Sequence, residues 1–173
     1  LAKHTTEAER IITKKELGEM QNQINEYFFP VTTPNSYCIA DIFLACRSLL
    51  LGKESHVCGK VYGFLSEPYT ASEQITLTYE DAVKIANSID PDSFLPIEFL
   101  VNGKEIGPRD LLDAFLTFLL DGANEYTVKP NQPWQIELDQ FPSLRDLNYK
   151  GSWVHADSLN DDYLSDRLRY QSW

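Results

Sequence analysis

The chain has 173 residues, 43% of them hydrophobic, which suits one sizeable packed domain and excludes a disordered chain. Its 15 Lys and Arg against 26 Asp and Glu give a net charge of −11. Phosphate backbones and anionic membrane surfaces repel such a chain, so we expect no nucleic-acid partner. We also expect no membrane span, because no apolar run reaches the roughly 20 residues required.

The three cysteines are Cys38, Cys46 and Cys58, and an odd number does not make a disulfide framework. One bridge with one free thiol remains an alternative. All three lie in the first half of the chain, so we expect them to serve local packing. The chain begins at Leu1, which fits either a fragment or a mature protein after processing.

Two capping-box signals mark helix starts. Residues 5–28 have the pattern of a helix, and Thr13 with Glu16 places a start within them. Thr78 with Asp81 has the same spacing, and we expect that helix to end before Pro91, since the residue before a proline disfavours the helical region. Each helix carries one apolar face, formed by Leu17, Met20, Ile24 and Phe28 in the first and by Ala82, Ile85, Ala86 and Ile89 in the second.

A hairpin and a further helix are expected after the second of these helices. Residues 97–101 are predicted as a strand that turns at Asn102-Gly103, where both residues tolerate positive φ. Residues 104–106 then pair back as a short strand. The helix that follows is expected to begin at Pro108 and to end at Gly122.

The corresponding helix of the first half is expected over residues 39–51. Residues 123–149 are predicted as an irregular connection with one strand at 134–138, and a last helix is expected from Ser158 toward Trp173. These elements predict a mainly α fold with minor β. It would consist of two duplicated helix–turn/hairpin–helix units plus a C-terminal helix.

The second half of the chain looks like a loose copy of the first. Residues 12–16 and 77–81 open the two units, and residues 49–52 and 118–122 close them. We expect a single domain over residues 1–173, with repeat-like units at about 10–68 and 75–140 and a C-terminal cap at 141–173. A duplicated unit of this size is typical of a stacked binding or scaffolding module rather than of an enzyme built around one cleft.

Residues 94–112 join a proline-led extended segment, an Asn-Gly-Lys turn and an apolar helix, and they resemble the pseudomurein-binding repeat of archaeal cell-wall proteins. Similar stretches occur in bacterial surface proteins, whose Trp-led closing segment resembles residues 153–173. The resemblance is best over residues 77–120 and 153–173, and Asn35-Ser36-Tyr37 replaces the turn in the first unit. It implies non-catalytic association with a cell-envelope polymer at an extracellular or cell-surface location.

Three alternatives involve metal or catalytic chemistry. His56 and Cys58 form a His-x-Cys pair that Cys46 or Cys38 could join around zinc, but the spacing matches no usual zinc pattern. The acidic residues between positions 157 and 166 suit the first turn of a helix better than a calcium loop. Paired carboxylates could hydrolyse glycosides, but among 26 Asp and Glu some pairs arise by chance. We therefore expect no metal, no cofactor and no enzyme activity.

The end of the chain is rich in Trp and Tyr, which either stack on sugar rings or close a satellite core. We expect Asn102, Gly103 and Lys104 of the turn, with Trp134 and Trp153, to contact a wall polysaccharide or peptidoglycan-like polymer. Rings would stack on sugars, while turn amides and Lys104 donate hydrogen bonds. The alternative function is a helical protein–protein interaction or assembly domain, including a homodimer, and a hydrolase ranks third.

Overall fold

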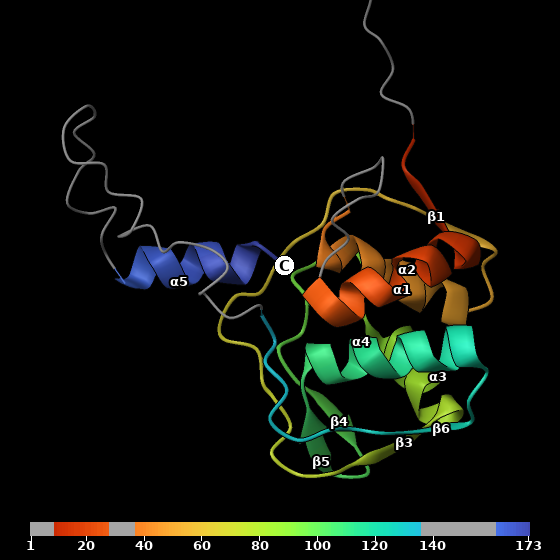
Figure 1. Cartoon of the computed structure of the whole chain (residues 1–173). Helices are drawn as coiled ribbons and strands as arrows, with labels where there is room; N and C mark the ends of the chain where they lie inside the picture. The colour runs from red at the N-terminus through yellow and green to blue at the C-terminus, as the bar shows by residue number, and fades with distance from the viewer. Residues whose placement is uncertain (1–8, 28–36, 136–161) are drawn as a thin grey trace, which may run out of the picture.

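A computed structural model of the chain describes residues 9–27, 37–135 and 162–173. In this part of the chain, five α-helices and three two-stranded antiparallel sheets form a mixed α/β fold (Figure 1). The helices are α1 (Lys14–Tyr27), α2 (Ile39–Leu50), α3 (Tyr79–Ser88), α4 (Pro108–Leu116) and α5 (Asp162–Gln171), with a π-helical turn η1 (Thr117–Asp121). The strands are β1 (Ile11–Thr13), β2 (Ser55–Val57), β3 (Thr76–Thr78), β4 (Phe99–Val101), β5 (Lys104–Ile106) and β6 (Glu125–Thr127).

Helix α2 lies at the centre of the hydrophobic core. All of its residues except Arg47 and Leu49 are buried, and it packs against both α3 and α4. A helix that is apolar on nearly every side is stable only when other elements surround it. The ring of Phe43 accordingly contacts Phe115 from α4, at 5.6 Å between ring centroids, and Phe99 from β4, at 6.3 Å.

Both predicted capping boxes are present. The backbone amide of Glu16 donates to Thr13 Oγ1 at 3.2 Å, and that of Thr13 donates to Glu16 Oε2 at 3.3 Å. Thr78 and Asp81 exchange the same pair of bonds at 3.1 and 3.0 Å. Helix α3 ends at Ser88, before Pro91 as predicted. The prediction of helix ahead of Thr13 is wrong for residues 9–13: residues 9 and 10 are not helical, and the backbone of residues 11–13 pairs with β2.

Two of the three sheets join strands that are distant in sequence. Strand β1 pairs with β2, so that Ile12 faces His56, and β3 pairs with β6, so that Leu77 faces Tyr126. In each case the first strand leads directly into a helix, and the second follows a later helix or the π-helical turn. Each pair thus ties the two ends of a long segment together.

The third sheet is the predicted hairpin, although its first strand begins at Phe99 and not at residue 97. Strands β4 and β5 pair antiparallel across Asn102 and Gly103, with Val101 opposite Lys104. Helix α4 begins at Pro108 as predicted, and the π-helical turn η1 extends it to Gly122, whose φ of 64° ends it in the left-handed region.

Helix α5 lies to one side of helices α1–α4, and its C-terminal end meets the core (Figure 1). The backbone oxygen of Tyr170 accepts from the amide of Phe64 at 2.9 Å, and Trp173 is 3% exposed. The predicted strand at 134–138 does not include Trp134 or Gln135, and its remaining residues lie outside the described part of the chain. So do residues 158–161, the predicted beginning of the last helix.

Arg47 joins α2 to the end of α3. Its Nε donates to the carbonyl oxygens of Ala86 and Ile89, both at 3.0 Å. These carbonyls lie at the C-terminal end of α3, which carries a partial negative charge, and that of Ala86 also accepts from the amide of Ile89 at 3.4 Å. A guanidinium suits this position because its positive charge strengthens the hydrogen bonds that it donates to these carbonyl oxygens.

We predict that Arg47→Ala lowers the free energy of unfolding by about 1.5–3 kcal/mol, the range for hydrogen bonds made by a charged group. Urea denaturation followed by far-UV circular dichroism measures the change. The control is Lys15→Ala, whose side chain is 87% exposed in an ion pair with Glu19 and should cost under about 0.5 kcal/mol. Equal stability of the two variants would show that Arg47 does not stabilise the contact between α2 and α3.

Candidate binding surface

The turn between β4 and β5 presents three of the predicted ligand-contacting residues. Asn102, Gly103 and Lys104, called the hairpin turn below, are all exposed. Asn102 has a φ of 52° and Gly103 a φ of 77°, the two consecutive left-handed residues of a tight hairpin turn. A Cβ at Gly103 would meet open space, so glycine is needed there for its backbone conformation and not for lack of room.

Buried side chains of the two strands anchor the hairpin turn to the core. Phe99 and Val101 of β4 and Ile106 of β5 point into the core. Lys104 Nζ lies 3.1 Å from Glu73 Oε2, and both side chains are about half exposed. An exposed ion pair of this kind is worth about 1 kcal/mol or less, so a ligand that accepts a hydrogen bond can compete for Lys104.

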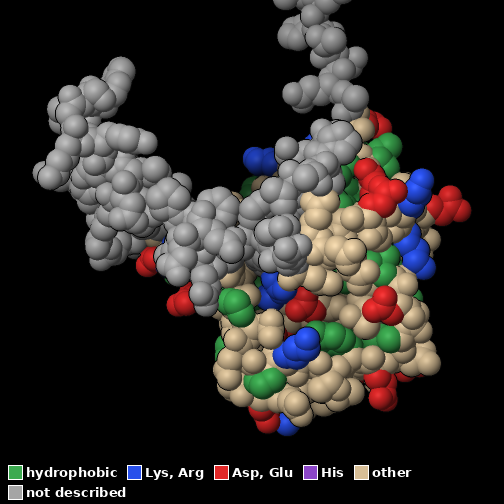
Figure 2. Space-filling model, in the orientation of Figure 1, with side chains coloured by type: hydrophobic (Ala, Val, Ile, Leu, Met, Phe, Trp, Pro, Cys, Tyr) green, Lys and Arg blue, Asp and Glu red, His purple; other side chains and the backbone are tan. Residues whose placement is uncertain are grey.

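The outward face of the hairpin also carries an apolar side chain. Leu100 is 66% exposed, because alternate residues of a strand point to opposite sides. On the face drawn in Figure 2, hydrophobic side chains form small separate patches among acidic and basic ones.

Trp134 does not lie on this surface. It is 7% exposed and belongs to an aromatic cluster with Phe64, Tyr170 and Trp173. Its backbone oxygen accepts from Trp173 Nε1 at 2.8 Å. The prediction that Trp134 stacks on a sugar is therefore corrected, since its ring is covered by protein, which agrees with the alternative of a satellite core. Trp153 lies outside the described residues.

The structure reveals an aromatic pair that sequence reasoning did not select. The rings of Tyr62 and Phe94 lie 5.5 Å apart between centroids, and Phe94 is 39% exposed. Lys60 Nζ lies 5.1 Å from the centroid of Tyr62. Phe94 was part of the motif that carried the resemblance, but no sequence signal connected it with Tyr62.

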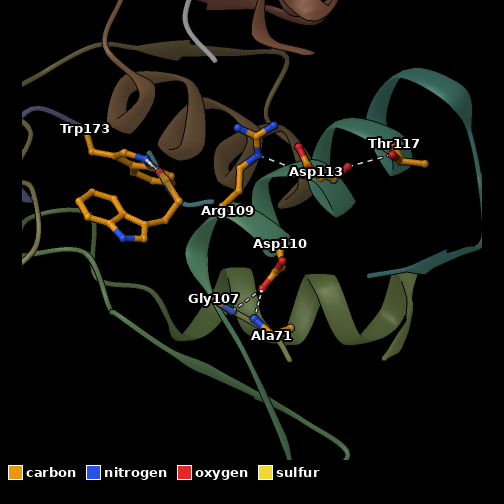
Figure 3. A network of polar contacts seen from close by, with 8 residues as sticks. Ala71, Gly107, Arg109, Asp110, Asp113, Thr117 and Trp173 are labelled. Carbon is orange, nitrogen blue, oxygen red and sulfur yellow. Dashed lines mark hydrogen bonds and ion pairs between the residues drawn. The ribbon is translucent and has the colours of Figure 1, made fainter. Parts of the chain in front are cut away.

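A buried carboxylate fixes the segment that leads from β5 into α4. Asp110 Oδ2 accepts from the backbone amides of Gly107, at 2.9 Å, and Ala71, at 3.0 Å (Figure 3). Its Oδ1 is buried and has no hydrogen-bond partner in the described part of the chain. Burial raises the pKa of Asp110, while the two amide bonds oppose that shift. Both bonded amides belong to backbone, so this carboxylate organises the fold around the hairpin.

Asp113 lies one turn further along α4 and pairs with Arg109. Arg109 Nε donates to Asp113 Oδ2 at 3.2 Å, and both side chains are largely buried. Burial raises the pKa of Asp113, and Arg109 opposes the shift. Burial also raises the pKa of Tyr126 to about 12, with a further contribution from the charge of Asp113. Figure 3 shows Arg109 and Asp113 on neighbouring turns of α4.

The cysteines and His56 act locally. All three thiols are free, and Cys38 Sγ accepts from the amide of Asp41 at the start of α2. His56 Nδ1 lies 2.8 Å from Ser48 Oγ. Among the described residues, no group of three or more His, Cys, Asp and Glu is placed to hold a metal ion. Of the acidic residues considered for calcium, Asp166 accepts from Arg169 at 3.3 Å, as in an ordinary helix ion pair.

Comparisons with known proteins found no match to the chain. No protein-family model matches the chain, and neither a curated protein nor a solved structure is significantly similar to it. No helix in the described ranges is both long enough and apolar enough to cross a membrane.

We predict that His56 makes the protein less stable in weak acid. Burial lowers the pKa of His56, so the unfolded chain binds a proton at a pH where the folded chain does not. The free energy of unfolding should therefore fall as the pH drops below about 6.5, through the lowered pKa of the folded state. Urea denaturation at about pH 7.5 and about pH 5.5 should show a smaller loss for His56→Asn than for the wild type. The same loss in both proteins would assign the acid sensitivity to other groups.

Proposed function

We propose that this chain is a non-catalytic module that binds a cell-envelope polymer, a wall polysaccharide or peptidoglycan-like chain, at the cell surface or outside the cell. The observation that carries the proposal is an exposed hairpin turn between two strands whose inward side chains are buried. It lies within the segment that resembles the pseudomurein-binding repeat. Two consecutive residues with positive φ give this turn one defined shape. A rigid turn loses little conformational freedom on binding, which favours affinity from few contacts.

Contacts at the hairpin turn would be short-range. Lys104 can exchange its ion pair with Glu73 for a hydroxyl or carbonyl oxygen of the polymer. Asn102 adds a side-chain amide that both donates and accepts. The net charge of −11 repels anionic polymers at long range, so binding to an anionic wall should strengthen as salt screens that repulsion.

The perturbed ionisable groups support a binding role more than a catalytic one. Asp110 and Asp113 have raised pKa values, but each carboxylate is bonded to a protein group. Burial raises the pKa of the Cys38 thiol to about 11, and this thiol caps a helix. Groups that serve catalysis converge on a shared opening, whereas these lie at helix starts and within ion pairs.

We also propose that the module arose by duplication of a strand–helix–helix–strand unit. Strands β1 and β2 enclose α1 and α2 in the same order in which β3 and β6 enclose α3 and α4. The first helix of each half begins with a capping box after a short strand. The second begins with a buried aspartate three residues after the capping residue, Asp41 in α2 and Asp110 in α4.

A second candidate function is assembly through the sheet of β1 and β2. Ile11 and Val57 lie opposite each other in this sheet and are 39% and 53% exposed. A two-stranded sheet leaves backbone groups available at its edges, and apolar neighbours favour pairing with another strand. This function predicts a dimer in sedimentation analysis that Val57→Lys dissociates.

The leading proposal predicts that purified cell walls retain the protein and that the hairpin turn is responsible. Lys104→Gln removes the charge, and Asn102→Gly removes the side-chain amide while keeping the positive φ. We expect the double variant to bind about tenfold more weakly in a co-sedimentation assay, which corresponds to about 1.4 kcal/mol.

Lys84→Gln is the matched control, since it removes one exposed lysine from α3. It should bind as the wild type does. If no wall preparation retains the wild type above a protein of similar charge, the proposed function fails. If the walls retain the double variant and the control equally, the hairpin turn is not the contact.

The duplication predicts equal roles for Asp41 and Asp110. Asp110→Ala leaves the amides of Gly107 and Ala71 without this acceptor, and Asp41→Ala does the same for the amide of Cys38 and removes one ion pair of Arg10. Each variant should lower the free energy of unfolding by roughly 1–3 kcal/mol in urea denaturation, the cost of unpaired buried groups. Exposed Asp92→Ala is the control. A harmless Asp41→Ala beside a destabilising Asp110→Ala would count against the duplication.

A further inference from the structure

The aromatic pair of Tyr62 and Phe94 has the properties of a ligand-binding platform. The two rings are inclined by 56° at a centroid distance of 5.5 Å, and Phe94 is 39% exposed. Tyr62 is half-buried, and the two rings together offer apolar surface at the edge of the core. Flat rings bind by apolar contact over a large area with little loss of conformational freedom.

Backbone bonds hold the two segments that carry these rings. The amide of Leu95, next to Phe94, donates to the carbonyl oxygen of Gly63, next to Tyr62, at 3.1 Å. On its other side, Gly63 packs so closely against α5 that a Cβ would collide with the backbone of Tyr170 and Gln171. Gln171 Nε2 donates to the carbonyl oxygen of Phe64 at 2.7 Å. The rings are therefore attached to a fixed backbone before any ligand arrives.

Charge selects among the ligands that stack on such rings. Lys60 is exposed, lies 5.1 Å from the centroid of Tyr62 and forms no ion pair with the described residues. Its amine can donate to a hydroxyl or acetamido oxygen at the rim of a stacked ring. A single lysine does not outweigh a net charge of −11, which repels an anionic polymer. A pyranose ring without charge offers an apolar C–H face to the rings and oxygens to the amine.

We propose that Tyr62 and Phe94, with Lys60 at their edge, form a subsite for an uncharged pyranose of a polysaccharide. The inference rests on the proposed function and names its sugar class and a second contact besides the hairpin turn. Stacking of a sugar on Tyr62 and Phe94 would replace the stacking predicted for Trp134, whose ring is buried. Phe94 lies on the segment that leads into β4 and the hairpin turn, whereas Tyr62 and Lys60 come from the segment between β2 and β3.

Affinity electrophoresis in native gels tests the subsite directly. Three gels contain glycol chitin, hydroxyethyl cellulose or polygalacturonate, and a fourth contains no polymer. We expect at least one of the two uncharged polymers to slow the wild type and polygalacturonate not to do so. Phe94→Ala and Tyr62→Leu should each weaken binding about tenfold, the upper range for one aromatic contact. Lys60→Gln should weaken it less.

The matched control is Tyr79→Ala, which removes a 41%-exposed aromatic side chain from the start of α3. It should bind as the wild type does, and far-UV circular dichroism should show that all variants are folded. If the wild type migrates alike in all four gels, or if polygalacturonate slows it most, the assigned sugar class is wrong. If Phe94→Ala and Tyr62→Leu bind as tightly as Tyr79→Ala, the aromatic pair is not the subsite.

Co-sedimentation with cell walls separates the subsite from the broader proposal. Walls that retain the wild type and Phe94→Ala equally overturn the subsite and leave the hairpin turn as the contact. Walls that retain neither protein overturn the proposed function. Retention of the wild type, with a clear loss in Phe94→Ala and none in Tyr79→Ala, supports both.

Discussion

The burial of α2 is the constraint on which the rest of the structure depends. A helix enclosed on nearly every side cannot give its terminal amides and carbonyls to water, so protein groups must bond them. Cys38 Sγ and the backbone oxygen of Trp173 accept from the first turn of α2, and Arg47 extends the bonding to the end of α3. Cys38 directly precedes α2, whereas Trp173 comes from the opposite end of the described chain. The C-terminal residues are thereby part of the core, although α5 itself lies to one side.

Local signals predicted the elements that depend on neighbouring residues. The capping boxes at Thr13 and Thr78 place the starts of α1 and α3, and Asn102-Gly103 places the hairpin. Each signal involves residues only a few positions apart, so sequence spacing is enough to recognise it. The sheet of β1 with β2 and that of β3 with β6 were not predicted. Three-residue strands show no clear alternation, and their partners are set by the packing of the helices between them.

The candidate site was predictable only in part, for a related reason. A turn that needs positive φ is visible in sequence, because few residues adopt that conformation. The exposure of an aromatic ring is a property of the assembled core and has no local signal. Trp134 is covered because α5 brings Tyr170 and Trp173 against it, whereas Phe94 stays partly open beside Tyr62. The sequence therefore showed where aromatic residues are concentrated, but it did not show which of their rings face solvent.

The three free thiols bear on the proposed location of this chain at the cell surface or outside the cell. An extracellular protein meets oxidants, and the reactive form of cysteine is the thiolate. Burial raises the pKa of Cys38 and of Cys58 to about 11, and raises that of fully buried Cys46 as well. Near neutral pH almost no thiolate forms at any of them, so their oxidation is slow. An exterior location and unpaired cysteines are thus compatible, because the core that encloses α2 also suppresses the reactivity of the cysteine within it.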